Sequence, residues 1–144
     1  MTIQSDVREF SGGTRRRNRA LAVVGAVVAA VLVWVVGEPL LGHDMVIKAE
    51  GQEPQDLGAS AMVMFSLFFS LLGWALLALL ERVTPRAALI WTVVALVVLA
   101  VSFFFPLFTI EASSGTKVVL ALAHVAVAAV LIPVFRATST NARK

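Results

Sequence analysis

A chain of 144 residues is the size of one domain, and 59% of its residues are hydrophobic while only 15% are charged. Because soluble domains carry more charge and less apolar surface than this, the composition predicts an integral membrane protein. The formal net charge is +3, but the basic residues flank apolar runs, which favours contact with anionic membrane lipid over nucleic-acid binding. Cysteine is absent, which excludes disulfides, thiolate metal sites and palmitoylation.

The first nineteen residues are polar and end in a basic run, Thr14–Arg19. We expect residues 1–19 to form a flexible basic cytoplasmic tail, and the unbroken apolar run over residues 20–36 predicts the first membrane span. A basic stretch before an apolar run also resembles a secretory or twin-arginine signal. The apolar run is longer than the core of a signal peptide, and no clear A-x-A site follows it, which favours an uncleaved span.

Residues 37–56 form the longest polar connection and carry five acidic residues against Lys48. We expect an acidic outer loop without assigned regular structure, in which residues 43–50 are compatible with a short strand or with a position on the membrane surface. Further apolar runs predict spans at about residues 57–80, 86–108 and 117–135. Since backbone groups inside a bilayer must be bonded within their own segment, all four spans are predicted to be α-helices. Residues 136–144 are predicted to form a second cytoplasmic tail.

The turn between the second and third spans holds Pro85, with Thr84 as the expected N-cap of the next helix. Such a short turn makes these spans antiparallel neighbours. Residues 20–135 are therefore predicted to form one all-α membrane domain, a bundle of four transmembrane helices. Ten of the 12 basic residues flank one side of the membrane, whereas Lys48 and Lys117 lie on the other. This bias predicts a multi-pass cell-membrane protein with both termini in the cytoplasm.

Small residues recur every three or four positions on the first span and form a face that lets another helix approach closely: Ala22, Gly25, Ala26, Ala29 and Ala30. The fourth span has a comparable set in Ala121, Ala128 and Ala129. We expect these two helices to touch. The same face also suits a seam with a second copy of the chain, and that alternative stays open.

His124 is the sharpest candidate for function, because ionisable groups at membrane depth are costly and usually face a partner, a cavity or a pathway. Counted from the outer side, Ser66, Ser102 and His124 lie at a similar depth in three different spans. They are predicted to share a polar layer. Three roles stay open for His124: a hydrogen bond that fixes helix register, binding of a small ligand or headgroup, and proton coupling.

Several other sites are disfavoured by the residues present. One intramembrane histidine does not supply the two axial ligands of a transmembrane haem. Glu38 and Glu81 lie at span ends, unlike the carboxylate deep within a proton-coupled exporter. His43, Asp44 and the nearby acids of the outer loop lack fixed ligand spacing for a divalent metal. The sequence has no phosphate-binding loop or nucleophile elbow. We therefore expect no enzyme activity, no cofactor and no metal site.

Three strings, at residues 73–82, 88–102 and 117–133, resemble an uncharacterised family of small four-helix integral membrane proteins found in actinobacteria. The likeness covers the second to fourth spans and is most distinctive at Trp91, Ser102, His124 and Pro133. Because that family has no known function, the resemblance implies a fold and a membrane location and supplies no catalytic residue.

The leading functional hypothesis is a non-enzymatic membrane module, either an accessory subunit, a lipid-binding protein or an envelope-associated protein. Membrane lipid is its expected partner, a membrane-protein partner or a second copy stays open, and nucleic acid is not expected. The alternative is a small transporter or proton-linked carrier that uses His124.

Overall fold

The computed structural model describes residues 12–108 and 110–140. Within these ranges the chain forms four long helices, α1 (Gly12–Val35), α2 (Ala59–Val83), α3 (Ala87–Phe108) and α4 (Ser114–Thr138). All four are long and apolar enough to cross a membrane. The predicted all-α membrane architecture of four helices is therefore confirmed.

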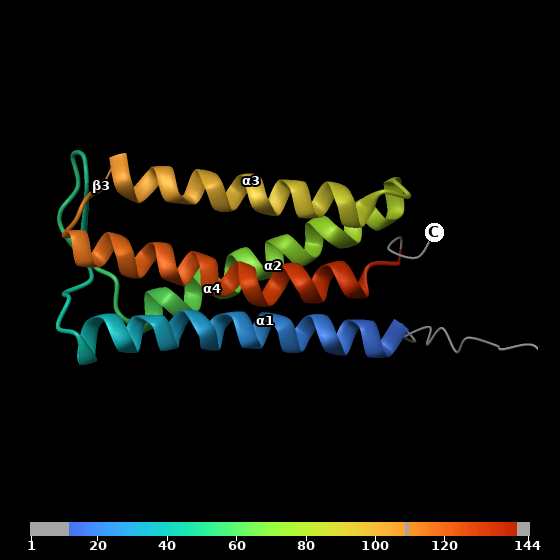
Figure 1. Cartoon of the computed structure of the whole chain (residues 1–144), viewed down its shortest axis with the longest axis horizontal. Helices are drawn as coiled ribbons and strands as arrows, with labels where there is room; N and C mark the ends of the chain where they lie inside the picture. Colours follow the sequence, from blue (N-terminus) through green and yellow to red (C-terminus); the bar gives the residue numbers. More distant parts are fainter. Residues whose placement is uncertain (1–11, 109, 141–144) are drawn as a thin grey trace, which may run out of the picture.

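Consecutive helices run antiparallel, so α1 and α3 begin at the end of the bundle where α2 and α4 finish (Figure 1). We call this the arginine end, after Arg15, Arg19 and Arg82, and we call the opposite end the sheet end. In Figure 1, α4 lies between α1 and α3, and α2 crosses obliquely behind it. The most extensive packing joins α1 to α4, followed by α1 to α2.

Three of the helices extend beyond their predicted boundaries. Because α1 begins at Gly12, the prediction of a flexible tail is wrong for residues 12–19, while residues 1–11 and 141–144 of the predicted tails lie outside the described residues. α2 ends at Val83, three residues further than predicted, and α4 runs three residues further than predicted at each end. Hydropathy marks only the apolar part of a helix, whereas arginine and other good helix formers continue its hydrogen bonding into a polar medium.

The sheet end is more ordered than predicted. α1 passes into a π-helical turn, η1 (Val36–Leu40), and the chain then forms β1 (Val46–Ala49) and β2 (Gln55–Asp56). β3 (Ile110–Glu111), from the connection between α3 and α4, completes an antiparallel sheet of order β2-β1-β3. The strand alternative for residues 43–50 is thus confirmed, and its second partner comes from a distant segment that local sequence does not reveal.

Hydrogen-bonded turns follow β1 and separate α2 from α3. Gln52 N donates to Ala49 O at 3.0 Å, and Gly51 in this turn has a φ of 76°, a conformation that favours glycine. At the other end of the bundle, Thr84 Oγ1 accepts a hydrogen bond from Arg86 N at 3.2 Å, just before α3 begins. The prediction that Thr84 is the N-cap of the next helix is wrong, because α3 begins at Ala87 and Thr84 is the C-cap residue of α2, whose N–H donates to the Leu80 carbonyl oxygen at 2.9 Å.

Among the residues that the structure describes, the core consists of two apolar clusters. The larger lies towards the arginine end, where the Trp91 and Phe135 rings pack with centroids 5.2 Å apart beside Leu77. The smaller, towards the sheet end, is built from Met45, Met62 and Val119. Elsewhere the helices expose many large apolar side chains, above all on α2 and α3. Such a surface suits contact with the hydrocarbon chains of a bilayer.

The small-residue face of α1 packs inside the chain, against α4. Ala22, Ala26 and Ala30 are buried, Ala29 is half-buried, and a Cβ added at Gly25 would lie 3.4 Å from Val130 Cγ1. The predicted contact between these helices is confirmed. The prediction of a packing face on α4 is wrong in part. Ala129 is exposed, and the buried alanine of that helix is Ala123.

Candidate functional site at the arginine end

A buried ion pair joins α1 to α2 at the arginine end. Arg19 Nη1 donates to Glu81 Oε2 at 3.1 Å, and Arg19 Nη2 donates to Glu81 Oε1 at 2.6 Å, so the contact is bidentate. The two side chains are only 6% and 13% exposed. The planar guanidinium matches the carboxylate in this geometry, which makes the pair both strong and directional.

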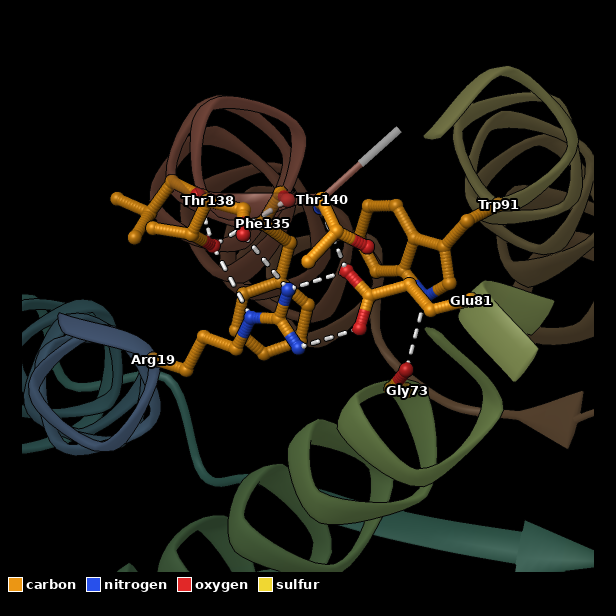
Figure 2. A network of polar contacts seen from close by, with 8 residues as sticks. Arg19, Gly73, Glu81, Trp91, Phe135, Thr138 and Thr140 are labelled. Carbon is orange, nitrogen blue, oxygen red and sulfur yellow. Dashed lines mark hydrogen bonds and ion pairs between the residues drawn. The ribbon is translucent and has the colours of Figure 1, made fainter. Parts of the chain in front are cut away.

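The same arginine also binds the end of α4. Arg19 Nε donates to Thr138 Oγ1 at 3.1 Å, and Nη2 donates to the Thr138 carbonyl oxygen at 2.8 Å (Figure 2). Thr140 N in turn donates to Glu81 Oε1 at 3.0 Å. The last carbonyl groups of a helix have no partner within it, so Arg19 serves as a side-chain cap for α4. The network therefore ties three of the four helices together.

The fourth helix joins this region through Trp91. Its Nε1 donates to the Gly73 carbonyl oxygen of α2 at 2.8 Å, and its ring lies against Phe135 of α4 (Figure 2). Trp91 is 4% exposed, so its indole N–H needs the protein acceptor that Gly73 provides. The Trp91 and Phe135 rings therefore pack next to the ion pair (Figure 2).

Beside the ion pair lies a polar crevice of about 630 Å³ between α1 and α2. Its lining consists of five residues of α1, four residues of α2 and Thr140: Gly12, Gly13, Arg15, Arg16 and Arg19 from α1, and Trp74, Ala78, Glu81 and Arg82 from α2. Arg15 Nε is buried and has no hydrogen-bond partner among the described residues. The crevice thus holds four arginines against one glutamate, and that charge balance suits an anion.

His124 does not lie within the bundle. Its side chain is exposed on α4, and Nδ1 lies 2.6 Å from the Leu120 carbonyl oxygen of the same helix. Since a carbonyl oxygen only accepts, Nδ1 is the protonated nitrogen in this contact. The bond satisfies the ring without joining α4 to another helix, so the predicted role in fixing register between helices is wrong.

Ser66 and Ser102 do not form the predicted polar layer with His124 or with each other. Ser66 Oγ donates to the Met62 carbonyl oxygen at 2.5 Å, and Ser102 Oγ donates to the Val98 carbonyl oxygen at 2.7 Å, each within its own helix. The fully buried serine of α2 is Ser70 instead. Equal depth along a span does not bring residues together when their side chains point in different directions around the helix.

The sheet end offers a different set of contacts. Glu38 Oε2 accepts from Trp34 Nε1 at 3.0 Å and from Met45 N at 3.3 Å, while Thr116 Oγ1 donates to the Asp44 carbonyl oxygen at 2.9 Å. Across the described ranges, no three histidine and acidic side chains gather closely enough to hold a metal ion. These contacts fix the loop and give one carboxylate oxygen of Glu38 two hydrogen-bond donors.

Sequence reasoning missed the pairing of Arg19 with Glu81 and the crevice beside it. It read Arg19 as a topology signal and Glu81 as an interfacial residue. A usable signal was present, because both residues stand where an apolar run meets a polar flank on the same predicted side of the membrane. Opposite charges at one level of a bundle are candidates for pairing.

A family model described as a family of unknown function, DUF6069, matches residues 10–141. The match covers all four helices and agrees with the predicted resemblance to an uncharacterised family, although the actinobacterial source stays a prediction. No curated protein and no solved structure matches the chain significantly.

Proposed function

The chain belongs to this family of unknown function, and from that premise we propose that it is a non-enzymatic, multi-pass module of the cell membrane that binds anionic lipid. Both termini lie in the cytoplasm, and the arginine end sits at the inner membrane surface. The resemblance of its three strings to actinobacterial proteins supports an actinobacterial membrane as the setting.

One observation carries this proposal, the separation of charge between the two ends. Among the described residues, the arginine end holds Glu81 and the following basic residues: Arg15, Arg16, Arg17, Arg19, Arg82, Arg86 and Arg136. The sheet end holds two lysines and these acidic residues: Glu38, Asp44, Glu50, Glu53, Asp56 and Glu111. Flanking arginines orient membrane proteins towards the cytoplasm and attract the anionic lipids of that leaflet.

The length of α1 supports the same placement. With η1 it spans 29 residues, Gly12–Leu40, which at 1.5 Å per residue is about 43 Å, against about 30 Å for the hydrocarbon core. The surplus extends the arginines of its first two turns beyond the hydrocarbon, to the level of the lipid headgroups. The alternative of a carrier gains no support from His124, because its side chain faces away from the bundle interior.

Orientation is testable by labelling, because the chain has no cysteine of its own. We expect Gln52→Cys, in the turn between β1 and β2, to react with a membrane-impermeant maleimide in intact cells. Thr140→Cys, at the arginine end, keeps the backbone N–H that binds Glu81 and should react only after permeabilisation. Both positions are exposed. The reverse pattern would refute the proposed orientation.

A further inference from the structure

We propose that the crevice between α1 and α2 binds the phosphate group of an anionic phospholipid. This inference rests on the proposed function, because it needs the arginine end at a membrane surface.

The helical repeat builds the two walls of the site. Arg15, Arg16 and Arg19 follow Gly12 by three, four and seven residues, which places them on one face of α1. Trp74 and Ala78 precede Arg82 by eight and four residues, which places all three on one face of α2. The Arg19–Glu81 ion pair holds these faces together, so the site is fixed before any ligand binds.

The charges on these walls are not equally available. Arg19 is already committed to Glu81 and Thr138. Arg15, Arg16 and Arg82 have no ion-pair partner in the part of the chain that the structure describes. Arg15 Nε is buried without an acceptor, and a buried donor of a charged group calls for one. Phosphate oxygens are acceptors that guanidinium groups bind bidentately.

The shape of the crevice favours a lipid over a free anion. Its volume of about 630 Å³ is larger than an inorganic phosphate needs. Trp74 lies eight residues from Arg82, which is about 12 Å along the helix towards the apolar middle of α2. The site is therefore charged at its rim and apolar at its inner end. An amphiphile places its phosphate at the rim and its glycerol and acyl chains beside Trp74 and Ala78.

Fluorescence quenching at Trp74 tests this directly. The full chain is reconstituted into vesicles of zwitterionic phospholipid that contain increasing fractions of phosphatidylglycerol with brominated acyl chains, which quench tryptophan on contact. Brominated phosphatidylcholine is titrated in parallel. The difference between the native chain and Trp74→Phe isolates the signal of Trp74 from those of Trp34 and Trp91. We expect the anionic lipid to quench Trp74 at about twentyfold lower mole fraction than the zwitterionic lipid.

Paired charge variants separate the crevice from the general charge of this end. Arg15→Gln with Arg82→Gln should bring the two lipids to near parity. The matched control, Arg17→Gln with Arg86→Gln, removes the same charge from exposed positions outside the crevice and should keep most of the preference. Circular dichroism confirms that each variant is folded. Equal loss in both variants would overturn the proposal in favour of diffuse attraction.

Inorganic phosphate distinguishes the source of the anion. If about 10 mM phosphate abolishes the quenching preference beyond the effect of chloride at equal ionic strength, the site takes free phosphate and the lipid assignment is wrong. An absent preference together with the expected cysteine labelling would refute this site and leave the proposed membrane orientation standing. Reversed labelling would refute the proposed function whatever the quenching shows.

Discussion

At the arginine end, hydrogen bonds and an ion pair between side chains join the helices. At the sheet end, most hydrogen bonds between distant segments are main-chain bonds of the strands and the loop. Arg19, Glu81 and Thr138 link three helices through their side chains. At the sheet end, β1 pairs with β2 and with β3, and the loop is anchored by Leu57 N donating to the Met45 carbonyl oxygen at 2.8 Å. The two ends should therefore respond differently to substitution.

The difference follows from what each arrangement requires. An ion pair that is almost excluded from water depends on both partners, because one charge left alone loses its compensation. A main-chain network tolerates changes of side chain, provided that the backbones can still approach each other. At the sheet end this approach depends on Gly37 and Gly115, which lie close to Val119 and His43.

The largest effect is expected at the ion pair. Glu81→Ala leaves the Arg19 guanidinium buried without its carboxylate and should lower the free energy of unfolding by about 3–5 kcal/mol. Thermal or denaturant unfolding in detergent, followed by circular dichroism, measures this loss. Arg19→Leu combined with Glu81→Leu removes both charges and should recover part of it.

A charge-matched control comes from the sheet end. Lys48 lies opposite Glu111 in the register of β1 and β3, and both residues are exposed. Glu111→Ala should therefore cost no more than about 1 kcal/mol. Equal losses for Glu81→Ala and Glu111→Ala would contradict the contrast between the two ends.

The next largest effect is expected at Gly37. An added Cβ would lie 2.6 Å from Val119 Cγ2, and Val119 is a buried, β-branched residue of α4 that cannot easily turn aside. Gly37→Ala should destabilise the protein by about 1–3 kcal/mol. Gly58→Ala is the control, since a Cβ there meets nothing within 4 Å. A similar stability for the two variants in the same unfolding assay would show that the sheet end packs more loosely than described.

The smallest effect is expected at His124. His124→Leu removes a hydrogen bond within α4 and replaces an exposed polar ring by an apolar side chain, so stability should change by less than about 1 kcal/mol. Thr116→Val, on the same helix, breaks the bond to the Asp44 carbonyl oxygen and should cost about 1–2 kcal/mol. A loss at His124 larger than that at Thr116 would indicate that a partner covers this face of α4.

The sequence was sufficient to predict the four helices, because the length of each apolar run can be determined from neighbouring residues alone. It was insufficient for the direction of His124, because α4 is apolar on every side over this stretch and no polar face marks which way residue 124 points. It was also insufficient for Arg19 and Glu81, which are 62 residues apart. Their pairing depends on which helices become neighbours, and hydropathy alone does not determine that.

The link between the first and last helices has a consequence for how the protein is made. Arg19 and Thr138 are 119 residues apart, and at about 5–20 residues per second a ribosome needs roughly 6–24 s to add that length. Glu81 is synthesised about half-way through this interval. During biosynthesis, Arg19 can therefore pair with Glu81 before it can bind Thr138. The packing of α1 against α4 is completed only after the last helix has been synthesised.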